Sequence, residues 1–234
     1  MLDIYRPEDS QEKILPVIIN VHGGGLIIGN KEFNRYFCAL LCKKGFLVYS
    51  IEYRLIPDCL IYDQIADVFM AMDYIKERLA ADGGDSSHVY MAGDSGGACL
   101  ITYVNAIQNS TNIARAANVT PSGLRINALG LISGMFYTSR FDKIGLFLPK
   151  YLYGRDYKKT SFAKYVNPEN RELLNSLAPV WLVTSHNDFL RRYTTDFEKA
   201  LTRAEREHEL VVFPKNKKLT HCLLYTSPSP RDRQ

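Results

Sequence analysis

The chain has 234 residues, of which 46% are hydrophobic and 23% charged, and its formal net charge is +4. That length suits one sizeable domain with its own core, and the composition is ordinary for a globular protein. No basic stripe points to nucleic acid, no apolar run approaches the roughly 18 residues of a membrane span, and no secretory signal is visible.

The first half of the chain predicts alternating strands and helices. In chain order we expect a strand at 2–7, a polar turn at 8–13, a buried strand at 16–21, a helix at 31–44, a buried strand at 46–51, a long helix at 58–81, a strand at 89–92 and a helix at 95–108. The expected strands are short apolar runs, whereas the expected helices repeat apolar residues every three or four positions. Gly45 is suited to end the helix that precedes it.

The second half continues this alternation around one long interruption. Apolar runs at 128–132, 180–184 and 209–213 predict three more strands, with a helix at 191–205. Strands that alternate with helices imply a mostly parallel central sheet with helices on both faces. Residues 135–165 are rich in Tyr, Phe, Lys and Arg and are too long for a simple connection. We expect a lid insertion there, helical around 144–153; a solvated surface excursion is the alternative.

Two glycine-rich segments directly follow predicted strands. His22-Gly23-Gly24-Gly25 follows the strand at 16–21, and Gly93-Asp94-Ser95-Gly96-Gly97 follows the strand at 89–92. A strand that runs into G-x-S-x-G is the nucleophile elbow of α/β-hydrolases, and an upstream HGGG segment is the matching oxyanion-hole loop. Together, in this order, they predict a serine hydrolase of the α/β-hydrolase fold. For the second segment the alternative is a plain glycine-rich turn between a strand and a helix.

Ser95 is the predicted nucleophile. The sharp turn would lift its hydroxyl above the edge of the sheet, where a base can take its proton. The helix that follows points its N-terminus at the site, which favours developing negative charge.

The glycines supply the expected oxyanion hole. Backbone N–H groups of Gly24 and Gly25, with Gly23 as a further candidate, would join the N–H of Gly96. We expect His22 and Asp94 to give structural support. His22 is a poor candidate for the base, because a catalytic histidine must come later in the chain.

The triad order in this fold is Ser, then acid, then His, so the base must follow Ser95. His221 is the predicted base because it follows the last expected strand by a short polar loop. His208 precedes that strand, where a satisfied or solvated histidine is expected. His186 lies on one loop with Asp188, too close in sequence to be its partner.

Asp188 is the predicted acid, because it lies just past the strand at 180–184. Its task would be to hold the imidazole in the correct tautomer and to stabilise its cation. Asp196 is the second candidate, but it falls inside the expected helix at 191–205, where a solvated charge is the ordinary role.

The cysteines do not suggest a metal site. There are five, an odd number without paired spacing: Cys38, Cys42, Cys59, Cys99 and Cys222. Reduced thiols in a cytoplasmic protein are the simplest interpretation. Cys38 and Cys42 lie four residues apart on an expected helix, and packing in the core is favoured because no second Cys or His pair lies at ligand spacing.

The C-terminal residues differ from the rest of the chain. Residues 222–232 resemble the translation of a transposon-type sequencing adapter, and the closing Ser-Pro-Ser-Pro-Arg-Asp-Arg-Gln suits neither a helix nor a core strand. We expect an α/β-hydrolase domain at 1–221 and a non-native tail at 222–234, which is excluded from fold reasoning. Native sequence would then stop near His221, with His or Gln at that position in the gene. The opening strand has no lead-in, so we expect truncation at both ends.

Several further segments strengthen one family resemblance. Residues 2–7 look like a strand that precedes HGGG, 53–58 (YRLIPD) is similar to a Y-R-L-A-P-E signature, 85–97 is similar to D-x7-G-D-S-A-G, and 187–190 (NDFL) resembles an acid-bearing D-P-L segment. Over roughly residues 2–221 the chain resembles the hormone-sensitive-lipase-like group of α/β-hydrolase esterases. It departs from that group in lacking the N-terminal cap helices, in lacking the final helix if the tail is adapter, and in reading His221-Cys222-Leu223 where H-G-F is usual.

The resemblance implies carboxylic-ester hydrolysis without a metal or organic cofactor. We expect a serine carboxylesterase that acts on short-to-medium acyl esters through an acyl-enzyme, with a small-molecule ester as its partner and a homodimer left open. One alternative is another acyl hydrolase: an arylformamidase, a deacetylase or a peptidase. The other is a non-catalytic ligand-binding homologue, which gains weight if position 221 is Gln in the gene.

Overall fold

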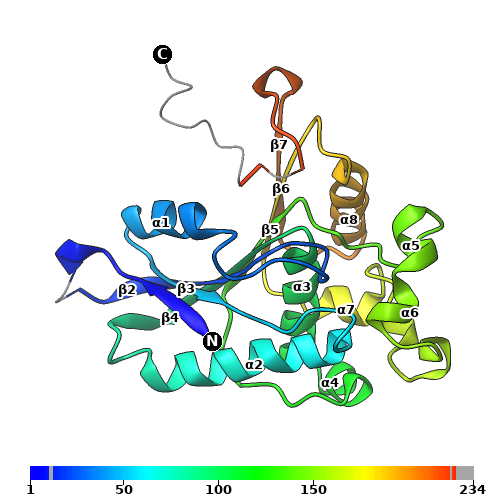
Figure 1. Ribbon diagram of the computed structural model, residues 1–234, viewed down its shortest axis with the longest axis horizontal. Coiled ribbons are helices and arrows are strands. Elements are labelled where there is room, and N and C mark those ends of the chain that lie inside the picture. The colour runs from blue at the N-terminus through cyan, green and yellow to red at the C-terminus, as the bar shows by residue number, and fades with distance from the viewer. Residues whose placement is uncertain (11–12, 222, 225–234) are drawn as a thin grey trace.

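A computed structural model describes residues 1–10, 13–221 and 223–224. Within these residues the strands form one seven-stranded sheet of order β1-β3-β2-β4-β5-β6-β7 (Figure 1). The strands are β1 (Leu2–Tyr5), β2 (Leu15–Val21), β3 (Leu47–Ile51), β4 (Gly84–Asp94), β5 (Ala128–Ile132), β6 (Val180–Ser185) and β7 (His208–Phe213). β1 is antiparallel to β3 and the other neighbours are parallel, which confirms the mostly parallel sheet.

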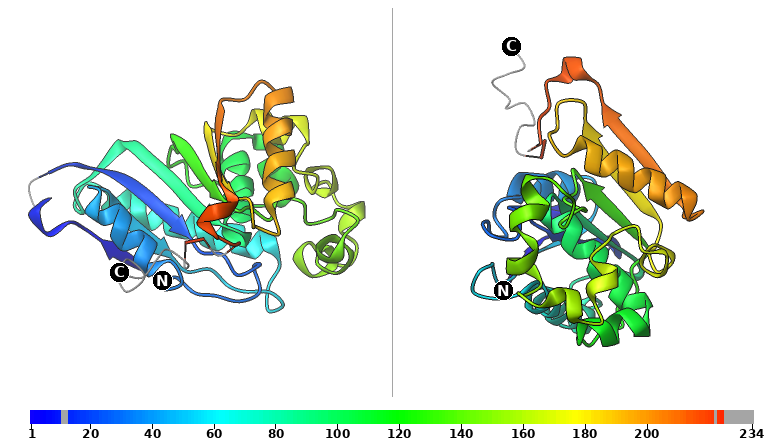
Figure 2. Two further views of the ribbon diagram at one scale, coloured as in Figure 1. Left: turned by 90° about the horizontal axis from the view of Figure 1, so that it is seen from above. Right: turned by 90° about the vertical axis from the view of Figure 1, so that its right-hand side faces the viewer.

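Helices cover both faces of the sheet, as predicted. They are α1 (Arg35–Lys43), α2 (Ile61–Arg78), α3 (Gly96–Asn109), α4 (Thr111–Ala117), α5 (Lys143–Phe147), α6 (Pro149–Leu152), α7 (Arg171–Asn175) and α8 (Arg191–Arg203), with short 3-10 turns η1 (Glu8–Ser10), η2 (Tyr157–Lys159), η3 (Ala163–Tyr165) and η4 (Lys215–Lys217). Figure 1 shows α1 on one side of the sheet and α2 on the other. The turned views show α5 and α6 at one end of the molecule, beyond α3 (Figure 2).

The alternation of side chains along the strands separates the two faces. In β2, Val17 and Ile19 join the large core with α2, α3 and α8, whereas Ile18 joins a smaller cluster under α1. Neighbouring strands repeat this pattern, since Tyr49 packs in the large core and Val48 in the smaller one. Strands buried on both faces explain why the sequence shows continuous apolar runs instead of alternation.

Several element boundaries differ from the sequence predictions. Helix α1 begins at Arg35 instead of residue 31, and the side chain of its N-cap residue Asn34 bonds to Asp94 and does not cap the helix. Helices α4 and α7 were not predicted, because one or two turns are too short to show helical periodicity. Both are held by N-terminal caps: Ser110 Oγ accepts from Ile113 N at 3.3 Å, and Asn170 Oδ1 accepts from Glu172 N at 3.0 Å.

The segment at 135–165 forms an insertion that contains α5 and α6, close to the predicted helical stretch at 144–153. Its inner side is an aromatic cluster against α3: Tyr103 packs on Phe162 with ring centroids 5.5 Å apart. The hydroxyls of Tyr103 and Tyr153 lie 2.9 Å apart, and Thr138 Oγ1 lies 2.7 Å from the Tyr153 hydroxyl. The insertion is therefore anchored on α3.

The cysteines of the described region are free thiols: Cys38, Cys42, Cys59 and Cys99. Cys38 is fully buried beside Ile18 and Val48, and burial raises the pKa of its thiol to about 12. This packing agrees with the predicted core role of Cys38.

Most of the predicted tail at 222–234 lies outside the described residues, including Cys222. Leu223 and Leu224 are described, and Leu223 packs in one cluster with Ile132 and Val183. The assignment of a non-native tail stays a prediction. Among the described helices, none combines the length and the apolar character that crossing a membrane requires.

We predict that Ile19→Ala destabilises the fold by about 2–5 kcal/mol, because it leaves a cavity in place of the fully buried Ile19 side chain of β2. The measurement is the free energy of unfolding in urea. Ile14→Ala is the matched control: Ile14 is 74% exposed, so its loss should cost less than about 0.5 kcal/mol. Equal destabilisation by the two variants would contradict the packing described for β2.

Candidate active site

Ser95 lies in the sharp turn between β4 and α3. Its backbone has φ 49° and ψ −114°, a conformation that non-glycine residues rarely adopt. Two backbone hydrogen bonds hold the turn: Ser95 N donates to the Ile132 carbonyl at 2.8 Å, and Met135 N donates to the Ser95 carbonyl at 3.0 Å. The strain is therefore fixed by β5 and by the segment that follows it.

The glycines beside Ser95 allow two loops to approach each other closely. A Cβ atom on Gly97 would lie 2.2 Å from the Val21 carbonyl oxygen, and one on Gly96 would lie 2.9 Å from Leu26 N. No side chain can occupy either position without moving backbone. The start of α3 thus packs directly on the His22–Gly25 loop that follows β2.

The structure brings Ser95, Asp188 and His221 together from three separate parts of the chain. His221 Nε2 lies 2.9 Å from Ser95 Oγ, and His221 Nδ1 lies 2.9 Å from Asp188 Oδ1. The His221 side chain is 14% exposed and the Asp188 side chain is fully buried. Such an arrangement can activate a serine, because a base that contacts the hydroxyl can take its proton and a carboxylate can orient the base.

The surroundings of Asp188 favour its ionised form. Leu190 N donates to Oδ1 at 2.8 Å, and Thr184 Oγ1 donates to Oδ2 at 2.9 Å. Burial raises the pKa of this carboxyl, but its interactions with the His221 imidazole, the Ser133 hydroxyl and the Leu190 N–H together outweigh burial, so the pKa lies below its ordinary value of 3.8. Asp188 therefore stays charged at neutral pH.

The backbone N–H groups expected to hold an oxyanion are available. Among the described residues, the N–H groups of Gly24, Gly25 and Gly96 have no hydrogen-bond partner. Gly24 and Gly25 have φ of 103° and 63°, which favours glycine. Gly23 does not have a positive φ, but a Cβ there would lie 2.4 Å from a carboxylate oxygen of Asp94.

The loop at 22–26, called the oxyanion loop after its predicted role, is held by hydrogen bonds and ring contacts from neighbouring side chains. His22 is buried, with Nδ1 2.8 Å from the Gly23 carbonyl and its ring stacked on Tyr53 at 4.3 Å. The Tyr53 hydroxyl donates to the His22 carbonyl at 2.8 Å. Gln64 of α2 donates to the Leu26 carbonyl at 3.0 Å. Gln64 was not among the predicted site residues, although a polar residue among the apolar positions 61, 65, 68 and 72 of the sequence was an available signal.

Asp94 belongs to a buried network of polar side chains joined by hydrogen bonds. Asn34 Nδ2 donates to Asp94 Oδ1 at 2.8 Å and to Asn20 Oδ1 at 3.3 Å. Asn20 Nδ2 in turn donates to Ser50 Oγ at 3.3 Å. Three of the strands that end at the site are joined in this way, and Asn34 and Asn20 had no distinguishing sequence signal.

The less favoured candidates lie elsewhere. His186 Nδ1 is 2.8 Å from the Arg191 guanidinium, and His208 Nδ1 is 2.7 Å from the Arg206 carbonyl. Asp196 of α8 pairs with Arg140 at 2.8 Å. None of the three contacts Ser95 or His221 in the described structure.

An apolar cavity of about 350 Å³ adjoins the oxyanion loop. Its lining is Gly25, Ile27, Met135, Lys143, Ile144, Phe147, Leu148 and Tyr151. The insertion and the oxyanion loop thus share one cavity, with Met135 next to the backbone of Ser95. Residues of α5 and α6 form one wall of this cavity.

Phe189 borders the site on the side of the histidine. Its ring lies 4.4 Å from the His221 ring, centroid to centroid, and its side chain is 73% exposed. Phe189 stands where the D-P-L pattern has proline. An apolar ring therefore faces solvent directly beside the imidazole.

Comparison with known proteins agrees with this architecture. A family model described as alpha/beta hydrolase fold matches residues 18–222. A probable isoprenylcysteine alpha-carbonyl methylesterase of Oryza sativa subsp. japonica is 29% identical over 184 residues, covering 74% of this chain and 44% of that protein. A tuliposide A-converting enzyme of Tulipa gesneriana is 30% identical over 131 residues, covering 50% of this chain and 35% of that protein. The chain spans less than half the length of these relatives.

Solved structures share the fold. Esterase B from Lactobacillus Rhamnosis superposes with a TM-score of 0.88 at 23% identity, covering 99% of this chain and 76% of that one. A bacterial heroin esterase gives a TM-score of 0.76 at 24% identity, covering 99% of this chain and 74% of that one. The chain belongs to the alpha/beta hydrolase fold family, and its predicted resemblance to the hormone-sensitive-lipase-like esterases is confirmed.

Proposed function

We propose that the protein is a serine carboxylesterase acting on short-to-medium acyl esters through an acyl-enzyme. Ser95 is the nucleophile, His221 the general base and Asp188 the group that orients it. The observation that carries the proposal is the His221 imidazole, whose two nitrogens lie 2.9 Å from Ser95 Oγ and 2.9 Å from Asp188 Oδ1. The esterase names of the relatives and structural neighbours support the same activity.

The chemistry follows from these contacts. Ser95 Oγ attacks the ester carbonyl carbon while its proton passes to His221 Nε2. The N–H groups of Gly24, Gly25 and Gly96, with Gly23 as a further donor, bind the oxyanion that forms. His221 then returns the proton to the departing alcohol, and water hydrolyses the acyl-enzyme by the same steps.

The position of the histidine assigns the two halves of the substrate. Because His221 must protonate the leaving oxygen, the alcohol lies on its side, next to the exposed ring of Phe189. The acyl chain then extends toward the cavity beyond Gly25, which Ile27 and Phe147 help to line. A cavity of about 350 Å³ lies at the small end of ligand pockets, which favours short and medium acyl chains.

The alternatives use the same site. An arylformamidase, a deacetylase or a peptidase would need only a different group beside Phe189, and faster turnover of an amide than of the matching ester would favour it. A ligand-binding homologue without catalysis would fail to react at Ser95 with a fluorophosphonate probe. The domain at 1–221 with its lid at 135–165, the cytoplasmic location and the homodimer stay predictions.

We expect Asp188→Asn to lower kcat by about 10⁴-fold, because the amide holds the wrong imidazole tautomer and carries no charge. The measurement is hydrolysis of 4-nitrophenyl butyrate. Asp196→Asn is the matched control, since Asp196 pairs with Arg140 and lies away from His221, and its kcat should stay near that of the wild type. Equal losses in the two variants would contradict the assignment of Asp188.

The lowered pKa of Asp188 predicts a pH-dependent contribution to stability. Ionisation is favoured in the folded state, so the stabilisation is fully present above the ordinary pKa of 3.8 and is lost as pH falls through the lower folded-state pKa. The difference in free energy of unfolding between wild type and Asp188→Asn, measured in urea, should therefore shrink between pH 6 and pH 3. A difference that grows toward acid pH would refute the sign of this pKa shift.

The cavity assignment predicts the preference for acyl chain length. Among 4-nitrophenyl esters, butyrate and octanoate should be hydrolysed faster than palmitate, measured as kcat/KM. Phe147→Ala opens one wall of the cavity and should shift the preference toward longer chains. Phe141→Ala is the control, because Phe141 is 93% exposed and does not line this cavity. Fastest hydrolysis of palmitate by the wild type would overturn the short-to-medium assignment.

A further inference from the structure

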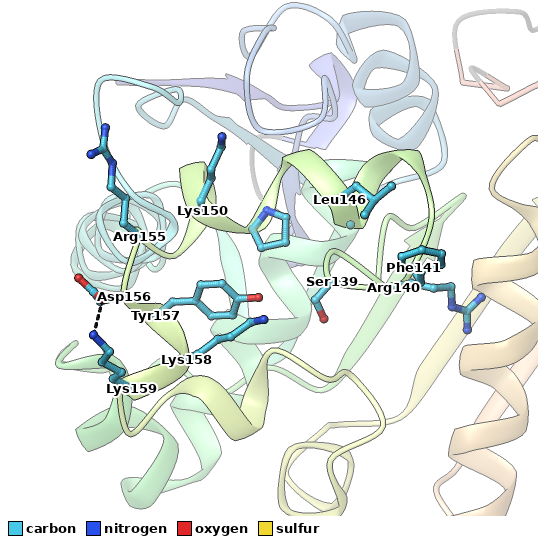
Figure 3. A pocket seen from close by; sticks show the side chains of 12 residues that line it. Ser139, Arg140, Phe141, Leu146, Lys150, Arg155, Asp156, Tyr157, Lys158 and Lys159 are labelled. Atoms are coloured by element: carbon cyan, nitrogen blue, oxygen red, sulfur yellow. Dashed lines mark hydrogen bonds and ion pairs between the residues drawn. The ribbon is translucent and has the colours of Figure 1, made fainter.

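A second pocket lies within the insertion, away from Ser95. It has a volume of about 590 Å³ and is bordered by α5, α6 and η2 (Figure 3). Gly145, Leu146 and Pro149 line it, whereas Ile144, Phe147 and Leu148 line the cavity beside the oxyanion loop. The α5–α6 segment is therefore a wall between two separate cavities.

The lining of this second pocket carries an excess of positive charge. Five cationic side chains and one carboxylate border it. Arg140 is paired with Asp196 and Lys159 with Asp156, each at 2.8 Å. The remaining three, Lys150, Arg155 and Lys158, form no ion pair within the described part of the chain.

Three polar groups converge in the pocket. Figure 3 shows Tyr157 and Lys158 pointing across it toward Ser139, whereas Lys150 and Arg155 point away. Within the described residues, the Ser139 hydroxyl, the Tyr157 hydroxyl and the Lys158 ammonium have no hydrogen-bond partner. An ammonium and two hydroxyls directed at one space provide donors for the oxygens of an anion.

The same pocket has an apolar side. Phe141 and Leu146 line it and are 93% and 56% exposed, and Pro149 lines it as well. Covering large exposed apolar side chains is favourable, by about 25 cal/mol for each Å² removed from water. A ligand that used the whole pocket would therefore combine a charged end with an apolar body.

We propose that this pocket is a binding site for an amphiphilic anion, such as a medium-chain carboxylate. Its oxyanion accepts hydrogen bonds from Lys158, Ser139 and Tyr157, and its chain lies against Leu146 and Phe141. The site is distinct from Ser95 and does not depend on the activity proposed for it.

The test uses octanoate as the probe on the full chain. Octanoate should slow amide hydrogen exchange in residues 155–159, which line this pocket and not the cavity beside the oxyanion loop, and calorimetry on wild type and variants should give the dissociation constant. Lys158→Ala should weaken that binding by about 10-fold or more, since hydrogen bonds to charged groups contribute more than neutral ones. Lys150→Ala is the matched control: it removes the same charge from the same rim, but its side chain points away, so binding should be retained.

Three results would overturn the proposal. Octanol protecting residues 155–159 as well as octanoate would show that the charge is not recognised. Inorganic phosphate giving the same protection would show that the apolar body is not recognised. Equal weakening of octanoate binding by Lys158→Ala and Lys150→Ala would show that only the general positive charge matters. Hydrolysis at Ser95 is measured on both variants as a separate check that the rest of the fold is intact, because neither lysine contacts Ser95 or His221 in the described structure.

Discussion

The candidate site depends on one steric constraint, the contact between the start of α3 and the loop after β2. With a Cβ at Gly97 the Val21 carbonyl would be only 2.2 Å away, and with one at Gly96 Leu26 N would be 2.9 Å away. Only glycine permits this approach, and the approach brings the N–H of Gly96 beside those of Gly24 and Gly25. The turn at Ser95 and the oxyanion loop are thus parts of one packed unit, and the shape of each depends on the other.

Buried polar side chains make this unit rigid. Tyr53 and Gln64 donate hydrogen bonds to backbone carbonyls of the oxyanion loop, and Asn34 connects Asp94 to Asn20. A buried polar group that loses its hydrogen-bond partner costs roughly 1–3 kcal/mol. Each of these hydrogen bonds therefore disfavours any loop conformation that would break it. The N–H groups therefore keep their direction without reorganising, which is the condition under which such donors stabilise a developing charge most effectively.

Local patterns in the sequence predicted much of this arrangement, and non-local contacts account for what it missed. The strands, Ser95 and the glycine loops were recognisable because each motif is contiguous and directly follows an apolar run. Asp188 and His221 followed from their order after Ser95, but the two distances of 2.9 Å depend on how β6 and β7 pair. Asn34 was beyond prediction, because its partners are 14 and 60 residues away in sequence.

The insertion is connected to the turn at Ser95 through one helix. Helix α3 begins directly after Ser95, and two turns later its Tyr103 hydroxyl lies 2.9 Å from that of Tyr153. Tyr153 immediately follows α6, and Thr138 binds the same hydroxyl from the start of the insertion. Helix α3 therefore contributes to the position of both Ser95 and the α5–α6 wall. If the proposed function is correct, a substitution in the aromatic cluster around Tyr103 should change acyl selectivity together with the packing of the core, because the same contacts hold the wall on α3.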